Sequence, residues 1–395
     1  MHRPMRQYAE GGLRVSEQSA EYIAADHSKR VKGLQERMAA EGLDAVVATT
    51  FENTLYYGGS YIMTIEALPN RLAMLLIPVD EDPTFLVCNI EESLVRSQSW
   101  VNDIRTYVEF AENPADALLT LLEERGLPGK RIGIEYRHLQ AAYFRILQGA
   151  SETTFCPADE ILNRGRMVKS EDEIDVMTRI GMATIRAVES GYSHVNEGAT
   201  ERVLADAMCN HLYQEKAEEV SFLVLGAGQR CTGGHPLPTD YRLQRSDLIR
   251  VDIGGRLSHY RSDVARMAVV GNPTSKQERL YRNVCEAQRA IIDAMRPGRE
   301  ASTLYRICSN YLAGEGINLQ SPHVGHALGL GLHEDPMLNP YDHTPLEPGM
   351  VFCVEPFFWD ASGQVYHIED LVLVTDDGAV VLTDVDGERR SLVYR

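Results

Sequence analysis

Two segments in the C-terminal half of the chain share a pattern, an apolar strand–turn–strand unit with a carboxylate on each arm. LIRVDIGG…YRSDVARMAVV carries Asp252 and Asp263, and MVFCVEPFF…YHIEDLVLVT carries Glu355 and Glu369. Strand side chains alternate between two faces, and the apolar neighbours indicate that these acids are partly buried. Clustered buried carboxylates repel one another and need protons or cations between them. The chain must therefore fold so that four acids share a compensated centre.

One imidazole completes this set. His326 lies in GHALGLGLHEDP, a Gly-rich turn between the two units. Carboxylates with one imidazole are hard donors that suit Mn²⁺, Co²⁺ or Fe²⁺ better than a thiolate-loving ion. Two cations about 3.5–4 Å apart would neutralise the acids and lower the pKa of a water between them toward roughly 7. The five residues therefore predict a dinuclear hydrolytic metal site.

The composition is that of a soluble protein with two domains. A length of 395 residues allows two full-sized cores, and 44% hydrophobic and 24% charged residues are ordinary values. The net charge of -18 argues against nucleic acid or an anionic membrane as partner. Seven scattered cysteines without a CxxC pair, and an N-terminus without a signal peptide or membrane-spanning run, predict a reduced, cytoplasmic protein.

Periodicity divides the chain into three parts. Residues 1–27 are polar and are expected to form a flexible segment. Residues 28–163 alternate amphipathic helices with short apolar strands such as DAVVATT, AMLLIPV and IGIEY, which predicts a smaller α/β domain. Residues 164–395 open with a capping box from Ser170 to Glu173 and combine long helices with β-rich segments, which predicts an α+β domain. The expected boundary lies near Asn163–Lys169.

These residues and spacings resemble the metal-dependent pita-bread family, which includes methionine aminopeptidase, aminopeptidase P, prolidase and the metal-free relative creatinase. The matching stretches are VDIGG, YRSD, GHALGLGLHEDP, LEPGMVFCVEP and IEDLVLVT, and the likeness covers Met167–Asp384. It implies a C-terminal pita-bread catalytic domain preceded by a smaller creatinase/prolidase-like N-terminal domain. It also implies a homodimer with two divalent metal ions per chain, Mn²⁺ being preferred and Co²⁺, Fe²⁺ or Zn²⁺ being alternatives.

The resemblance further implies a role for each of the five residues. Asp252 would bind one metal ion, and His326 and Glu355 would bind the other. Asp263 and Glu369 would bridge the two ions. Glu355 would also take the proton from the attacking water and pass it to the leaving nitrogen.

Residues around this site are assigned to the substrate. By resemblance, His235 in GGHPLP and His333 would hydrogen-bond the substrate carbonyl or its tetrahedral oxyanion. Arg71, which follows ENTLYYGG, would reach the active site of the partner in a dimer and clamp a substrate carboxylate, although it also fits an ordinary surface arginine. The other substrate-binding candidates are Tyr57, His323 and His367.

Three positions depart from the family's pattern. Pro322 stands where many aminopeptidases P and prolidases have a histidine, and His323 lies one residue closer to the ligand. Ala327 replaces the second glycine of GHG, and His367 replaces the arginine of R-x-E-D. We expect these positions to affect substrate recognition rather than the metal site.

The predicted function is a dinuclear-metal-dependent hydrolase, an Xaa-Pro peptidase of the aminopeptidase P or prolidase type that uses a metal-bridging hydroxide. The altered positions leave open a creatinase-like enzyme that acts on a small non-peptide amide or metabolite. A non-catalytic binding module on the same scaffold is a further alternative, against which the presence of all five candidate ligands argues. The expected partner is a small peptide or small-molecule amide, with neither nucleic acid nor membrane involved.

Overall fold

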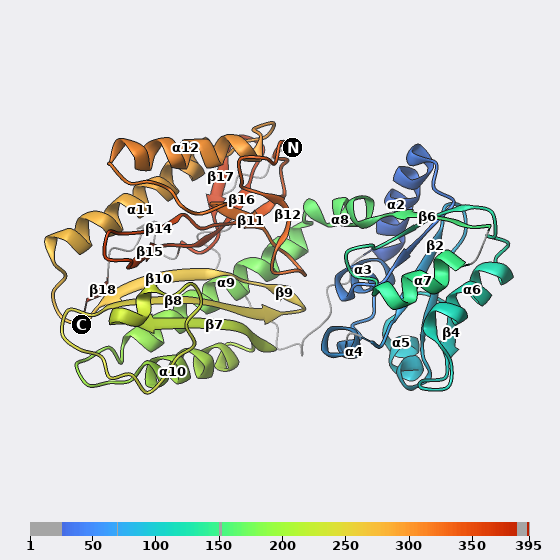
Figure 1. Cartoon of the computed structure of the whole chain (residues 1–395), viewed down its shortest axis with the longest axis horizontal. Helices are drawn as coiled ribbons and strands as arrows, with labels where there is room; N and C mark the ends of the chain where they lie inside the picture. The colour runs from blue at the N-terminus through green and yellow to red at the C-terminus, as the bar shows by residue number, and fades with distance from the viewer. Residues whose placement is uncertain (1–25, 69, 150–151, 385–392, 395) are drawn as a thin grey trace.

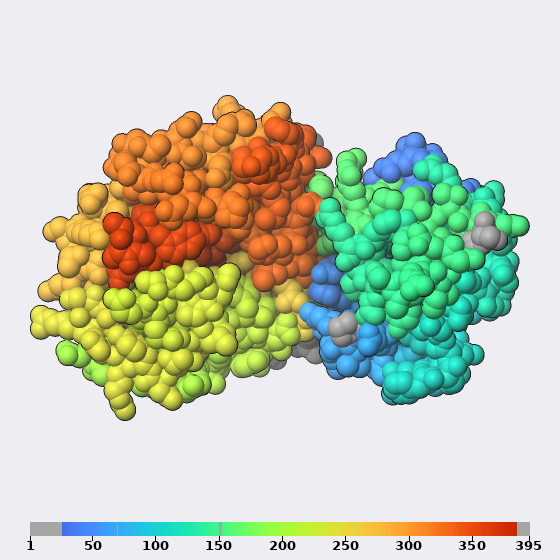
Figure 2. All heavy atoms as spheres, viewed as in Figure 1, coloured from blue at the N-terminus to red at the C-terminus, as the bar shows by residue number. Residues whose placement is uncertain are grey.

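The chain forms two lobes that lie side by side and meet over a narrower waist (Figure 1; Figure 2). The computed structural model describes residues 26–68, 70–149, 152–384 and 393–394. Between the lobes runs α8 (Asp159–Met167), which packs on helices of the first lobe and on a strand of the second. The boundary expected near Asn163–Lys169 thus falls at a helix that contacts both lobes, and the division at residue 163 stays a prediction.

The first described helix is α2 (His27–Glu41). It begins at Asp26, whose carboxylate accepts a hydrogen bond from the Lys29 amide at 3.0 Å, and it ends at Gly42, whose φ of 67° is left-handed. This helix begins one residue before residue 28, the expected start of the N-terminal domain. Of the flexible segment expected over residues 1–27, residues 1–25 lie outside the described residues.

A mixed six-stranded sheet with the order β4-β3-β2-β1-β5-β6 forms the centre of the N-terminal lobe. Its strands are β1 (Ala45–Ala48), β2 (Met74–Pro78), β3 (Thr84–Cys88), β4 (Asp103–Tyr107), β5 (Arg131–Ile134) and β6 (Thr154–Pro157). The connecting helices are α3 (Phe51–Gly58), α4 (Met63–Ala67), η1 (Asn89–Glu91), α5 (Glu92–Gln98), α6 (Pro114–Glu124) and α7 (Ala141–Gly149). Both faces of the sheet are covered, since Val46 packs in the core with α2 while its neighbour Val47 packs in the core with α6. This confirms the expected α/β domain.

The C-terminal lobe contains two main sheets and a short β ribbon between two pairs of helices. The first sheet contains β7 (Glu219–Ala227), β8 (Leu248–Leu257), β9 (Tyr260–Arg261), β10 (Val264–Val269) and β18 (Val393–Tyr394). The second contains β11 (Gly325–Ala327), β12 (Glu334–Met337), β13 (Val351–Val354), β16 (Asp370–Val374) and β17 (Ala379–Val381), and the ribbon pairs β14 (Phe357–Trp359) with β15 (Val365–His367). A 3₁₀ turn, η2 (Gly228–Thr232), follows β7.

Four helices enclose these sheets. Figure 1 shows α9 (Glu171–Tyr192) and α10 (Glu201–Gln214) on one side, and α11 (Ser275–Ala294) and α12 (Ala301–Gly314) on the other. The predicted capping box is present at the start of α9, where Ser170 and Glu173 exchange side chain–backbone hydrogen bonds. This arrangement confirms the α+β organisation. None of the described helices is both long enough and apolar enough to span a bilayer.

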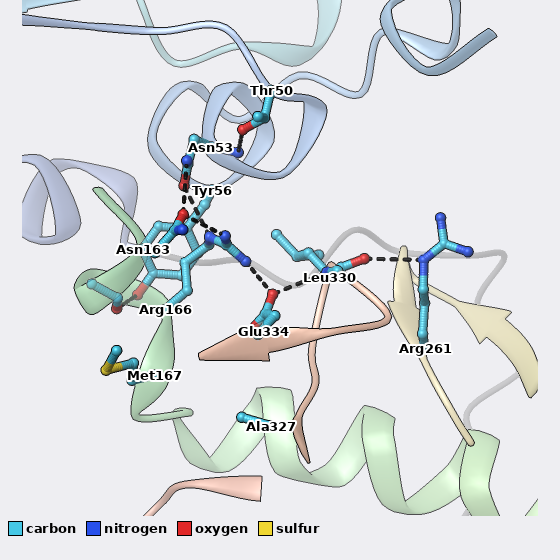
Figure 3. A network of polar contacts seen from close by, with 12 residues as sticks. Thr50, Asn53, Tyr56, Asn163, Arg166, Met167, Arg261, Ala327, Leu330 and Glu334 are labelled. Atoms are coloured by element: carbon cyan, nitrogen blue, oxygen red, sulfur yellow. Dashed lines mark hydrogen bonds and ion pairs between the residues drawn. The ribbon is translucent and has the colours of Figure 1, made fainter. Parts of the chain in front are cut away.

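Buried ion pairs join the two lobes. The guanidinium of Arg166, at the end of α8, pairs with Glu334 at the start of β12 and also donates to Asn53 of α3 at 2.9 Å and Asn163 at 2.8 Å (Figure 3). The Lys169 ammonium lies 3.2 Å from the second oxygen of Glu334. The Glu334 carboxylate therefore pairs with two buried, positively charged side chains at the waist of the molecule.

Candidate metal centre

The two strand–turn–strand units predicted from the sequence are both formed, and their acids converge. β8 pairs antiparallel with β10, and β13 pairs antiparallel with β16. Asp252 lies within β8, opposite Ala265. The other three acids stand one residue outside a strand, because Asp263 precedes β10, Glu355 follows β13 and Glu369 precedes β16. Strand ends thus provide three of the four carboxylates, where the sequence had suggested acids within the strands.

His326 enters the cluster from β11, which pairs with β13. Its Nε2 lies 3.2 Å from Oε1 of Glu355 and 3.5 Å from Oδ2 of Asp263. The Nδ1 atom is 3.0 Å from the carbonyl oxygen of Ala327, and because a carbonyl only accepts, Nδ1 carries the proton. This contact holds the ring in place and leaves Nε2 facing the carboxylates, where it could bind metal once it has lost its proton. At the preceding Gly325, a Cβ atom would collide with the carbonyl oxygen of Cys353.

A second group of potential ligands forms beside the first. The side chains of Asp252, His367 and Glu369 are buried, and each offers a ligand atom within 4.8 Å of the others. His367 Nε2 lies 2.9 Å from Oε1 of Glu369. Asp263 and Glu355, which belong to the group around His326, lie close enough to Glu369 for their charges to raise its pKa. Glu369 therefore lies near both halves of the cluster, where a bridging carboxylate would stand.

Unpartnered buried atoms test whether this cluster fits metal ions. Within the described residues, one ligand atom on each of the five predicted residues has no hydrogen-bond partner. These atoms are Asp252 Oδ1, Asp263 Oδ1, His326 Nε2, Glu355 Oε1 and Glu369 Oε2. A buried polar atom left without a partner costs roughly 1–3 kcal/mol, and more when the group is charged. Divalent cations would satisfy these lone pairs and neutralise the acids, so the donor set fits the two ions that the sequence predicts.

Burial and the crowding of charge raise the pKa values of some groups in the cluster and lower those of others. Burial, followed by the charge of Asp263, raises the pKa of Asp252 well above its usual value. Burial and then Asp252 raise that of Glu369 in the same way. Burial alone would lower the pKa of His326, but Glu355, Asp263 and the Ala327 carbonyl together outweigh burial and raise this pKa to about 9. Burial alone would raise the pKa of Glu355, but the charge of His326, together with the contributions of His323 and Glu369, outweighs burial and lowers this pKa. The cluster thus favours the protonated forms of Asp252, Glu369 and His326 when no cation is bound.

The predicted histidines lie around this cluster. The His333 ring stacks on His326 with centroids 3.8 Å apart and planes at 21°. His323 Nδ1 lies 3.3 Å from Oε1 of Glu355. His235 is exposed in the loop after η2, and after burial and Arg250 its charge also contributes to the lowered pKa of His367. The structure therefore brings His323, His333 and His367 to the cluster and leaves His235 on a nearby loop.

Two predicted substrate contacts are not brought to the cluster. Tyr57 is 0% exposed in the core of the N-terminal lobe, and its hydroxyl donates to the carbonyl of Leu162 at 2.8 Å. A side chain with no accessible surface does not contact substrate in this conformation, so the prediction for Tyr57 is corrected. Arg71 pairs with Glu109 and lies 3.6 Å from Glu91 within its own lobe. It does not reach the acids of its own chain through these contacts.

The sequence reasoning did not single out two residues beside the cluster. Arg250 is buried on β8, where its positive charge opposes the rise in the pKa of Asp252 and adds to the fall that burial causes in the pKa of His367. The two-residue alternation of β8 would have placed it on the same face as Asp252. Cys353 on β13 lies within ligand distance of Asp263 and His326. Burial and the nearby acids raise its pKa well above the usual value, so it is a neutral thiol that donates to the carbonyl of Asp263 at 3.8 Å.

Five candidate ligand side chains converge between two β sheets that paired helices enclose, an arrangement that fits a metal-dependent hydrolase. The model of metallopeptidase family M24 matches residues 175–376, which are 202 of the 395 residues, and that of the creatinase/prolidase N-terminal domain matches residues 30–168. The chain belongs to metallopeptidase family M24, and the resemblance to the pita-bread family is confirmed.

Individual relatives extend this likeness over nearly the whole chain. An Xaa-Pro dipeptidase of Pyrococcus horikoshii is 29% identical over 365 residues, which are 91% of this chain and 98% of the relative. The crystal structure of dipeptidase PepE from Mycobacterium ulcerans superposes with a TM-score of 0.84 at 27% identity, covering 93% of this chain and 97% of that one. The prolidase from Pyrococcus horikoshii OT3 gives a TM-score of 0.79 at 28% identity, covering 91% and 99%.

Proposed function

We propose that this protein is a metal-dependent Xaa-Pro peptidase of the prolidase type, which hydrolyses the bond before proline in a small peptide. The observation that carries the proposal is the convergence of five buried side chains with unpartnered ligand atoms. Membership of metallopeptidase family M24 supports hydrolysis, and relatives named Xaa-Pro dipeptidase and prolidase support the substrate class.

In this proposal, Asp252 would hold one ion, His326 and Glu355 would hold the other, and Asp263 and Glu369 would contribute to both. Divalent cations bound there polarise a substrate carbonyl and lower the pKa of a coordinated water. Mn²⁺ is the proposed ion, because four carboxylates dominate the donor set, and Co²⁺, Fe²⁺ and Zn²⁺ are the alternatives.

The chain's own groups would supply the proton transfers and the oxyanion contacts. Glu355 has a lowered pKa and is therefore ionised at neutral pH, so it accepts a proton from water and delivers it to the leaving nitrogen. Burial, followed by the charge of His326, lowers the pKa of His333. A neutral His333 can donate an N–H to the oxyanion, and His235 would do the same from the opposite loop.

A substrate panel tests the proposed function. After metal removal and reconstitution with Mn²⁺, we expect Xaa-Pro dipeptides to be cleaved in preference to longer Xaa-Pro peptides and to small non-peptide amides. Release of free proline measures the first reaction, and release of an N-terminal residue measures the second. Activity confined to non-peptide amides would replace the peptidase proposal by the creatinase-like alternative. Full activity after exhaustive chelation would contradict the metal-dependent mechanism.

The proposal includes a cytoplasmic homodimer. All seven cysteines are free thiols, which supports a reducing compartment. Arg71 would serve the partner's active site only if a second copy brings the N-terminal lobe over that site. We therefore expect sedimentation to show a dimer, and Arg71→Ala to raise KM for dipeptides more than it lowers kcat. A fully active monomer would remove this role for Arg71.

A further inference from the structure

We propose that His367 is a direct metal ligand, which completes the half of the centre formed by Asp252 and Glu369. This role replaces the contact with substrate that the sequence suggested for His367, and it rests on the metal centre proposed above. Neither the family match nor the relatives assign it, and the position is one at which this chain departs from the R-x-E-D pattern.

The donor geometry supports this assignment. One ligand atom from each of Asp252, His367 and Glu369 lies within 4.8 Å of the other two, and all three side chains are buried. Nε2 of His367 is 2.9 Å from Oε1 of Glu369 and 3.9 Å from Oε2 of Glu355. The imidazole is therefore among the carboxylates that hold metal, at the distances expected for side chains that share an ion.

Packing rather than hydrogen bonding holds the ring in place. His367 is the last residue of β15 and pairs with Phe357 of β14, whose ring lies 5.3 Å from the imidazole at 69°. The residue is 4% exposed, yet neither ring nitrogen has a hydrogen-bond partner among the described residues. Two nitrogens without a hydrogen bond in a buried ring carry an energetic cost that coordination of an ion by Nε2 would remove in part.

This ligand would give each half of the centre one imidazole. His326 serves the half that contains Asp263 and Glu355, and His367 serves the half that contains Asp252. Imidazole nitrogen favours Co²⁺ and Zn²⁺ more strongly than it favours Mn²⁺, whereas carboxylates suit Mn²⁺. A substrate-binding histidine would have no such effect, so the two roles differ in a measurement that needs no substrate.

Metal titration of the chelated full-length protein provides the test. We expect the wild type to bind two equivalents of Co²⁺ by calorimetry, and His367→Ala to weaken one of them by at least about 10²-fold, because changes even to second-shell partners cost 10–100-fold. Mn²⁺ affinity should fall by a smaller factor. His343→Ala, which removes an exposed imidazole away from the metal centre, is the matched control and should keep both Co²⁺ affinities.

The outcomes separate this inference from the metal centre itself. Unchanged Co²⁺ binding by His367→Ala would overturn the assignment while leaving the centre intact. Absence of metal binding by the wild type would overturn both. X-ray absorption of the Co²⁺-loaded wild type is independent of whether the variant folds. It should show about one imidazole per cobalt, whereas a centre with His326 as its one histidine ligand would show about one half.

Discussion

Glu369→Ala is expected to remove bound metal and to lower kcat/KM by about 10³-fold or more. The side chain lies close to acids of both halves of the centre, since the charges of Asp252, Asp263 and Glu355 all raise its pKa, so its loss should affect both proposed ions. Lewis-acid catalysis contributes several kcal/mol of transition-state stabilisation, and each 1.36 kcal/mol is a factor of ten in rate. Metal content by mass spectrometry and steady-state kinetics measure the two losses together. Asp263→Ala should behave in the same way.

The stability of the metal-free protein separates a metal-binding role of Glu369 from a purely structural one. In the metal-free protein, Glu369 and Asp252 have pKa values well above the usual range because burial and mutual repulsion oppose their ionisation. Removing one of these acids therefore relieves an unfavourable arrangement. We expect metal-free Glu369→Gln to unfold at the same temperature as the metal-free wild type or at a higher one.

Added metal should then distinguish the two proteins. Mn²⁺ should raise the melting temperature of the wild type, because an ion that binds only the native state stabilises it, and should leave that of Glu369→Gln nearly unchanged. The exposed Glu300, in the same domain, provides a control, since Glu300→Gln should keep the metal response. Loss of stability in metal-free Glu369→Gln, with retained metal binding, would contradict the assigned role.

The sequence predicted the cluster well because its determinants are local. Apolar runs define β8, β10, β13 and β16, and fixed spacings place the acids at or near those strands. Gly325 belongs to the motif GHALGLGLHEDP, but the reason that glycine is needed there, the close carbonyl of Cys353, appears only in the fold. Local patterns did not show where each strand ends. Three acids that were predicted to lie within strands therefore stand one residue outside them. Backbone pairing sets that limit, and side-chain type alone does not reveal it.

Contacts between distant segments were not predictable in this way. Arg71 and Tyr57 were assigned to substrate by their place in the sequence, but the first pairs with Glu109 and the second fills the N-terminal core. The partner of Arg166 lies at Glu334, 168 residues further along the chain. No periodicity connects positions so far apart. Similarly, His367 was noticed as a departure from a pattern, yet only the fold places its ring beside Asp252 and Glu369.

Glu334→Gln is the second change from which we expect a large effect, in this case on stability. Its carboxylate accepts from the backbone amide of Gly331 at 2.9 Å, pairs with Arg166 and lies 3.2 Å from the Lys169 ammonium. All three ionic side chains are buried. Removing one member of a buried ion pair typically costs 3–5 kcal/mol, because it leaves an uncompensated charge, so we expect the free energy of unfolding to fall by about that amount. Urea unfolding followed by fluorescence and by circular dichroism measures it.

The pH dependence of this effect follows from the shift at Glu334. Burial alone would raise its pKa, but Arg166 and then Lys169 outweigh burial, and the pKa lies below the ordinary 4.5. A carboxyl whose folded pKa is depressed contributes stability above its unfolded pKa and loses it as the pH falls through the folded value. The difference in the free energy of unfolding between wild type and Glu334→Gln should therefore be largest at neutral pH and should decrease steadily below about pH 4.5.

An exposed ion pair provides the matched control for this change. Glu160 pairs with Arg164 at 3.0 Å on the same helix that carries Arg166, but its side chain is 82% exposed. Exposed pairs contribute roughly 0–1 kcal/mol, so Glu160→Gln should barely move the unfolding curve at any pH. If both substitutions had equally small effects on the free energy of unfolding, an uncompensated buried charge at the waist would not be what destabilises Glu334→Gln. Because Glu334 directly follows His333 and binds the Gly331 amide, Glu334→Gln should also lower kcat by disturbing the loop that presents that imidazole.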